Sequence, residues 1–151
     1  DAVLGKRYEI GLVTAKPDDP HLTSSHFAGE PLELIVPAGQ SVSSWADLER
    51  LGYIDHPDGR AMATRLLSRC FPVRGFVNQV GLILEPVARG MGFTVLPQYA
   101  RQAFARHSEI KVMTLERDVV DSLWMISRAE WPLSARARYA MEYLRQQLGD
   151  R

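Results

Sequence analysis

Short apolar runs alternate with helix-like segments along most of the 151-residue chain, and this alternation limits the possible folds more than any other feature. The runs are rich in leucine and β-branched residues and end at turn signals, which is typical of buried strands. They predict strands over residues 8–13, 31–37, 53–55, 73–77, 93–96, 110–115 and 122–127. Strands that alternate with helices favour an α/β fold with a largely parallel sheet.

Capping signals place the helices between these runs. Ser44, with Asp47 three residues later, predicts a capped helix that ends at residue 51, and Ser134 predicts the start of a last helix through 148. Further helices are expected over 58–70, over 79–89 and from Pro97 onward. The polar stretch 14–29 predicts a loop. The apolar faces are expected to be Met62, Leu66, Leu67 and Cys70 in one helix, and Ala137, Ala140, Met141, Tyr143, Leu144 and Leu148 in the last.

Composition excludes several classes of protein. Lys and Arg total 18, as do Asp and Glu, so the chain lacks the basic excess of a free-standing DNA-binding domain. Cys70 is the single cysteine, which excludes an internal disulfide and a multi-cysteine zinc site and fits a reducing cytoplasm. No stretch approaches the roughly 20 apolar residues of a membrane helix.

The ends of the expected strands supply the candidate ligand site. In open α/β sheets, ligands sit where strands end and helices begin, and the free N–H groups of a helix start favour a carboxylate or another small anion. This reasoning selects Thr14, Asp58, Gly59, Arg60, Asn78, Gln79, Phe93, Thr94 and Pro97.

Several of these residues also have a purely structural interpretation. Asn78 fits an N-cap and Arg60 a solvated helix residue, while His56 fits a turn better than a catalytic base. Nucleophile-elbow, phosphate-loop and HExxH motifs are absent, so no catalytic residue or cofactor is predicted. His21 and His26 flank a loop but offer too few ligands for a predicted metal site.

Three segments resemble one known family. Residues 8–13 read YEIGLV, followed by EPLELIVPAG at 30–39; residues 87–97 read VARGMGFTVLP; and LWMISR at 123–128 precedes PLSARAR at 132–138. In this order and spacing they resemble the effector-binding (substrate-binding) domain of LysR-type bacterial transcription regulators. Glu9 stands where that family's first segment usually has Asp.

The resemblance implies a two-lobed, periplasmic-binding-protein-like (type 2) fold with crossing hinge strands at 32–37 and 123–128. The first lobe would comprise 1–37 and 128–151, and the second 38–127. The first lobe is expected to be incomplete, because the resemblance leaves one strand–helix–strand unit of that lobe, and the winged helix-turn-helix, outside this sequence.

The function implied is that of a cytoplasmic sensor. A small-molecule effector would bind between the lobes, and DNA would be contacted only by the missing domain. The resemblance also implies a homo-oligomer, in which the 60–70 helix would offer residues such as Ala63 or Arg69 to a partner. A solute-binding receptor of a transport system is the alternative, and a small enzyme on an α/β scaffold is a third.

Overall fold

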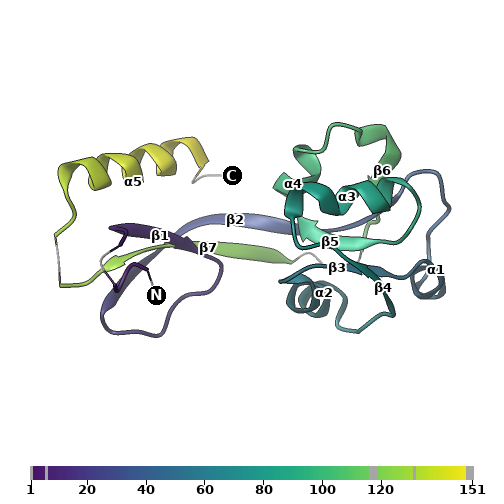
Figure 1. Cartoon of the computed structure of the whole chain (residues 1–151), viewed down its shortest axis with the longest axis horizontal. Helices are drawn as coiled ribbons and strands as arrows, with labels where there is room; N and C mark the ends of the chain where they lie inside the picture. The colour runs from purple at the N-terminus through teal and green to yellow at the C-terminus, as the bar shows by residue number, and fades with distance from the viewer. Residues whose placement is uncertain (1, 6, 116–118, 131, 149–151) are drawn as a thin grey trace. The chain divides into compact units, whose positions relative to one another are not determined.

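A computed structural model describes residues 2–5, 7–115, 119–130 and 132–148 (Figure 1). The internal contacts divide the chain into two compact units: unit 1 is Asp1–Glu30 with Val120–Arg151, and unit 2 is Pro31–Val119. The elements are β1 (Ile10–Val13), β2 (Leu22–Pro37), α1 (Trp45–Leu51), β3 (Tyr53–Asp55), α2 (Gly59–Leu67), β4 (Val73–Phe76), α3 (Val80–Ala88), β5 (Thr94–Pro97), α4 (Gln98–Gln102), a 3-10 turn (His107–Glu109), β6 (Ile110–Val112), β7 (Val120–Arg128) and α5 (Ala135–Leu148).

Unit 2 is built around strand β5. Strands β3 and β4 pair in parallel, joined by helix α2, and Tyr53 of β3 bridges in parallel to Phe93 just before β5. Strand β2 pairs antiparallel with β5 and with β6. Helix α3 carries the chain from β4 to β5, so the parallel strands are the ones that helical crossovers connect.

Two apolar cores cover opposite faces of this sheet. On β2, Leu34 and Val36 belong to the core with helices α1 and α2, whereas Ile35 between them belongs to the core with α3 and α4. Val95 and Leu96 of β5 divide in the same way, as the two-residue repeat of a strand requires. Burial on both faces explains why these strands read as continuous apolar runs.

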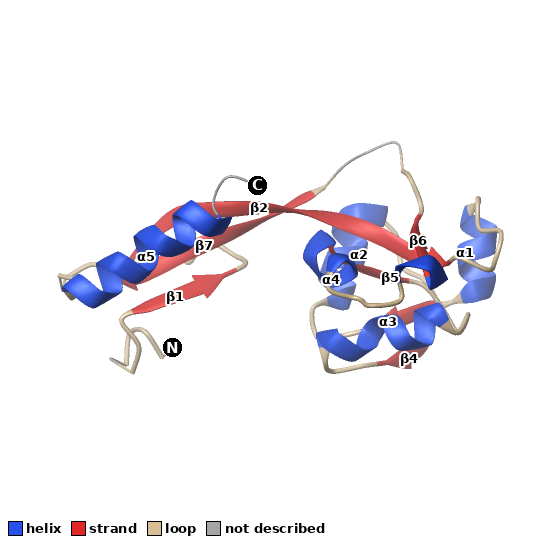
Figure 2. Ribbon diagram, turned by 90° about the horizontal axis from the view of Figure 1, so that it is seen from above, coloured by secondary structure: helices blue, strands red, loops and turns tan. Residues whose placement is uncertain are grey.

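Unit 1 is a smaller strand layer covered by helix α5 (Figure 2). Strand β1 pairs antiparallel with β7, which lies next to β2 in the sheet. Phe27, Ala28 and Met125 form its buried cluster, against which Met141 and Leu144 of α5 pack. Strand β1 has one neighbouring strand among the described residues, and Leu12 on it is exposed.

The prediction of a largely parallel sheet is wrong for much of the molecule. Strand β2 runs antiparallel to β5 and β6, because it enters unit 2 from unit 1 and no helical crossover sets its direction. The predicted loop over 14–29 is also wrong in its second half, since β2 begins at Leu22. Polar residues such as Thr23 and Ser24 hide this strand from an apolar pattern, while β7 beside it provides the pairing.

The capping signals were more reliable than the lengths of the helices. Ser44 and Ser134 accept hydrogen bonds from the backbone N–H groups of Asp47 and Ala137, as predicted. Helix α2 ends at Leu67, and the left-handed conformation of Ser68 places Cys70 outside the helix and exposed, so its expected packing is wrong. The structure also exposes Tyr143 and buries Ala63, contrary to expectation, while the side chain of Leu148 lies outside the described residues.

A buried ion pair fixes helix α4 on strand β2. The Arg101 guanidinium donates to both carboxylate oxygens of Glu33, at 2.7 Å and 3.1 Å. The Glu33 side chain is 9% exposed and that of Arg101 is 28% exposed. A carboxylate this deep is tolerated because the pairing is bidentate, and loss of one partner leaves an uncompensated charge.

We therefore expect Arg101→Ala to lower the free energy of unfolding by about 3 kcal/mol. Arg50→Ala is the matched control, because the Arg50 side chain is 78% exposed in its pair with Asp47. That change is expected to cost less than about 1 kcal/mol. Urea unfolding of both variants measures the difference, and equal losses would show that burial of Glu33 does not govern this contact.

Candidate functional site

The topology of unit 2 brings two strand ends together at one edge. Strands β3 and β5 run in the same direction, and they lead into helices α2 and α4, which pack on opposite faces of the sheet. This is the switch point at which open α/β sheets bind ligands. We call the 55–60 turn together with Pro97 and Gln98 the switch-point edge.

Buried hydrogen bonds hold the turn between β3 and α2. The Tyr53 hydroxyl donates to the carbonyl of Gly59 at 2.9 Å. The His56 side chain is also buried, and its Nε2 lies 3.0 Å from the carbonyl oxygen of Val95 on β5. Because a carbonyl only accepts, Nε2 carries the proton in this contact. The backbone N–H of His56 donates to the Asp55 carboxylate at 2.9 Å.

Gly59 is required by the tightness of this turn. A Cβ at this position would fall against the Asp55 carboxylate and within 2.9 Å of both the His56 ring and the Tyr53 hydroxyl. The sequence singled out Gly59 because it opens a helix, and the structure adds a steric reason for glycine there.

Four of the predicted site residues are exposed, and they lie at the starts of α2 and α3. Asp58 is the N-cap of α2 and Arg60 lies in its first turn, and both are exposed. Asn78 and Gln79 are exposed before α3, and Gln79 rather than Asn78 occupies the N-cap position. Neither N-cap side chain closes a capping bond, which leaves first-turn N–H groups of both helices without a side-chain acceptor at the cap.

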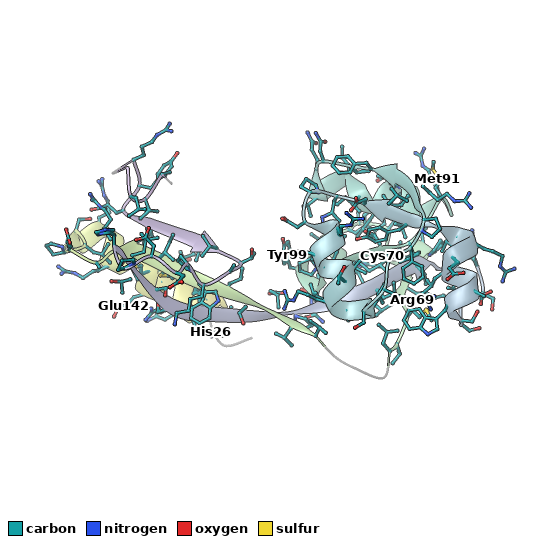
Figure 3. All side chains as sticks on the ribbon, turned by 90° about the horizontal axis from the view of Figure 1, so that it is seen from below. His26, Arg69, Cys70, Met91, Tyr99 and Glu142 are labelled. Atoms are coloured by element: carbon teal, nitrogen blue, oxygen red, sulfur yellow. The ribbon has the colours of Figure 1, made fainter. Side chains whose placement is uncertain are left out.

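The three predicted residues of the β5 segment are buried. Phe93 packs against Tyr53 at 5.3 Å between ring centroids, and the Thr94 hydroxyl donates to the Ile54 carbonyl at 2.9 Å. Pro97 is buried as the N-cap residue of α4. These side chains therefore support the switch-point edge from within. Tyr99, which follows Gln98 on α4, is exposed, and the sequence analysis did not select it (Figure 3).

Thr14 belongs to unit 1, where it is exposed just after β1. Nearby, Trp124 has the Lys16 ammonium 5.4 Å from its ring centroid and His26 edge-on at the same distance. His26 lies on β2 rather than at a loop. The role of Thr14 as a ligand contact stays a prediction.

Hollows in unit 2 do not coincide with the predicted residues as a group. Arg60 lines a small cavity of about 50 Å³ with Asp55 and Cys70. A larger hollow of about 610 Å³ lies beside Trp45 and Met113, away from the predicted residues. The switch-point topology favours the edge over this larger hollow, which is open and has no charged side chain among its lining residues.

The described part of the chain contains no group of three or more His, Cys, Asp or Glu side chains placed to hold a metal ion. Within the same residues, no helix combines the length and the apolar character that crossing a membrane requires.

Solved structures identify the class of fold. The chain resembles the CcmR regulatory domain of Synechocystis PCC6803 in complex with 2-PG (TM-score 0.79, 20% identity, 97% of this chain and 76% of that one). It resembles HinK, a LysR family transcriptional regulator from Pseudomonas aeruginosa (0.76, 18%, 98% and 56%), and the effector binding domain of QuiR in complex with shikimate (0.72, 12%, 98% and 75%). The fold is therefore the periplasmic-binding-protein-like (type 2) fold of effector-binding domains.

The family follows from the sequence itself. Residues 1–149 match the LysR substrate binding domain family, so the chain belongs to that family. The match confirms the resemblance drawn from the three sequence segments. The chain spans 56% of the length of HinK, and no curated protein sequence matches it.

Tyr53 is the titratable group of this site with a strongly changed pKa. Burial raises the pKa of the Tyr53 phenol well above its usual range, and the charge of Asp55 raises it further. At high pH the folded chain keeps the Tyr53 proton, whereas the unfolded chain releases it. The stability that Tyr53 contributes is therefore fully present below about pH 10 and falls as the pH rises further.

When the pH is raised, we expect the phenolate absorbance of the native chain to include a rise at unusually high pH, from ionisation of Tyr53. The Tyr53→Phe variant should lack this rise. The stability of the native chain should also fall more steeply than that of Tyr53→Phe above about pH 10. Spectrophotometric titration and urea unfolding at several pH values measure both effects. Identical titration curves for the two proteins would contradict the burial of this phenol.

Proposed function

We propose that this chain is the effector-sensing domain of a LysR-type transcription regulator. Its membership of the LysR substrate binding domain family over residues 1–149 is the observation that carries this proposal. The switch-point edge of unit 2 supports this proposal, because the ends of β3 and β5 and the start of α2 lie together there, as at the ligand sites of open α/β sheets.

The ligand of this edge is proposed to be a small anion. Arg60 supplies a positive charge in the first turn of α2, and the N-terminal N–H groups of this helix favour negative charge. Asp58 accepts hydrogen bonds from hydroxyl groups, so the edge suits a hydroxylated carboxylate or a phosphate ester. The CcmR and QuiR domains were solved in complex with 2-PG and with shikimate.

The predicted residues divide by role in this proposal. The exposed Asp58, Arg60, Asn78 and Gln79 contact the ligand, with Gly59 contributing backbone. The buried Phe93, Thr94 and Pro97 hold the edge in place. Thr14, which is exposed in unit 1, stays a predicted ligand contact and is given no role at this edge.

Ligand binding is proposed to act as a population shift between two states of the regulator, without chemistry on the ligand. DNA contact would belong to a separate domain, in agreement with the zero formal charge of this chain. The lobes proposed are 1–37 with 128–151 and 38–127, in a cytoplasmic homo-oligomer. Ala63 is buried and so does not offer the predicted partner contact, whereas Arg69, exposed in its pair with Glu49, stays a proposed one.

The alternative of a solute-binding receptor shares the fold, and family membership supports the regulator over it. In the full-length protein, the test is a change in DNA affinity when the effector is added. A receptor for transport would instead bind its solute with no effect on DNA.

We expect Arg60→Gln to weaken binding of a small anion about tenfold, the loss typical of one charge-assisted hydrogen bond. Inorganic phosphate, shikimate and 2-PG are the probes, first by thermal shift and then by calorimetry. Arg50→Gln, which makes the same charge change on α1, should leave the affinity within about twofold. An equal loss in both variants would indicate a non-specific charge effect and would remove Arg60 from the site.

A further inference from the structure

The switch-point edge is tied to the core by side chains that do not face solvent. Tyr53 and His56 are each about 4% exposed, so nearly the whole of each side chain is closed to solvent. Both make hydrogen bonds to backbone carbonyls, and in both cases one end of the bond lies in the turn that begins α2. Buried polar groups are costly unless they are paired, so these bonds need an explanation beyond the packing of apolar side chains.

The two bonds hold opposite sides of the same turn. The Tyr53 hydroxyl reaches forward to Gly59, which precedes Arg60, while His56 reaches sideways to Val95 on the neighbouring strand. Inside the turn, the N–H of Gly59 donates to the carbonyl of His56 at 2.8 Å. The two side-chain bonds thereby link the turn to β3 at Gly59 and to β5 at His56.

We propose that Tyr53 and His56 are positioning residues of the ligand site: they set the orientation in which the turn presents Asp58 and Arg60. This inference rests on the proposed function, because it assumes that the exposed residues of the turn meet the ligand. Neither residue touches the ligand. Each acts through the backbone of the turn, and a displacement well below the length of a side chain is enough to misalign a charged contact.

The geometry also explains why the turn is assembled from these residue types. A phenol reaches across the turn from a strand position to Gly59, and an imidazole is short enough to bridge to the adjacent strand. Phenylalanine at position 53 keeps the ring packed on Phe93 and removes only the donor. Glutamine at position 56 places an N–H close to that of Nε2, whereas leucine removes it.

The first arm of the test needs no ligand. Tyr53→Phe should speed amide hydrogen exchange at the start of α2, at Gly59 and Met62, whose N–H groups bond to the carbonyls of His56 and Asp58, and leave the amides of α3 unchanged. Exchange that is unaltered in α2, or accelerated equally in both helices, would overturn the inference, because the bond would then support the unit as a whole.

The second arm measures affinity for inorganic phosphate by calorimetry, well below the unfolding temperature. Tyr53→Phe and His56→Leu should each weaken phosphate binding about fivefold, the change expected for one lost hydrogen bond, and His56→Gln should restore most of the affinity. Ser44→Ala is the matched control, since it removes a helix cap elsewhere in unit 2 and should lower stability without changing phosphate affinity.

The outcomes separate the two proposals. If the native chain shows no affinity for phosphate, the proposed anion site fails and the positioning roles fail with it. If the native chain binds phosphate and Tyr53→Phe and His56→Leu bind it equally well, the site stands and the positioning roles are wrong. If His56→Gln binds no better than His56→Leu, the hydrogen bond to Val95 is not the reason that His56 matters.

Discussion

Strand β5 is the constraint on which the arrangement of unit 2 depends. Its four residues are buried on both faces, and β2 pairs with it along one edge. On the other edge, the start of β3 is held at Phe93 by two backbone hydrogen bonds, from Ile54 N–H to the Phe93 carbonyl and from Phe93 N–H to the Gly52 carbonyl. The cores beneath α2 and beneath α3 both include β5 residues, so neither helix pair can shift without disturbing this strand.

The switch-point edge is a direct consequence of that arrangement. Strands β3 and β5 run in the same direction, and the helices that follow them cover opposite faces, so the chain diverges where the two strands end. Tyr53, His56 and Thr94 fix β3 and the turn before α2 through hydrogen bonds to backbone carbonyls. A ligand site works best when supporting residues hold its contacts in a fixed geometry, and these hydrogen bonds provide that support.

The sequence predicted most of the elements and the family, because these depend on local patterns. Apolar runs found β3, β4 and β5 within one residue or so, and Ser44 and Ser134 marked helix starts that the structure confirms. Pairing direction was not predictable, since β2 is antiparallel to β5 for a reason that lies in the connection between units.

The sequence predicted where the candidate site lies, but it did not predict which of its residues are exposed and which are buried. Strand-end reasoning selected Gly59 and Arg60 together with Phe93, yet burial separates the exposed residues from the supporting ones, and only tertiary structure reveals that. The sequence analysis interpreted His56 as a turn residue, because a single histidine belongs to no recognisable motif. Its hydrogen-bond partner Val95 is distant in sequence and could not be predicted. The early half of β2 was missed for a related reason, since its polar residues are half-buried only through a neighbouring strand.

The most direct test of the account is an amide chemical-shift map of the isotopically labelled chain, titrated with whichever of phosphate, shikimate and 2-PG gives the largest thermal stabilisation. The account predicts that the largest shifts fall at Gly59, Arg60 and Gln98, around the switch-point edge. Shifts that instead concentrate at Trp45 and Met113, which line the larger hollow, would contradict it.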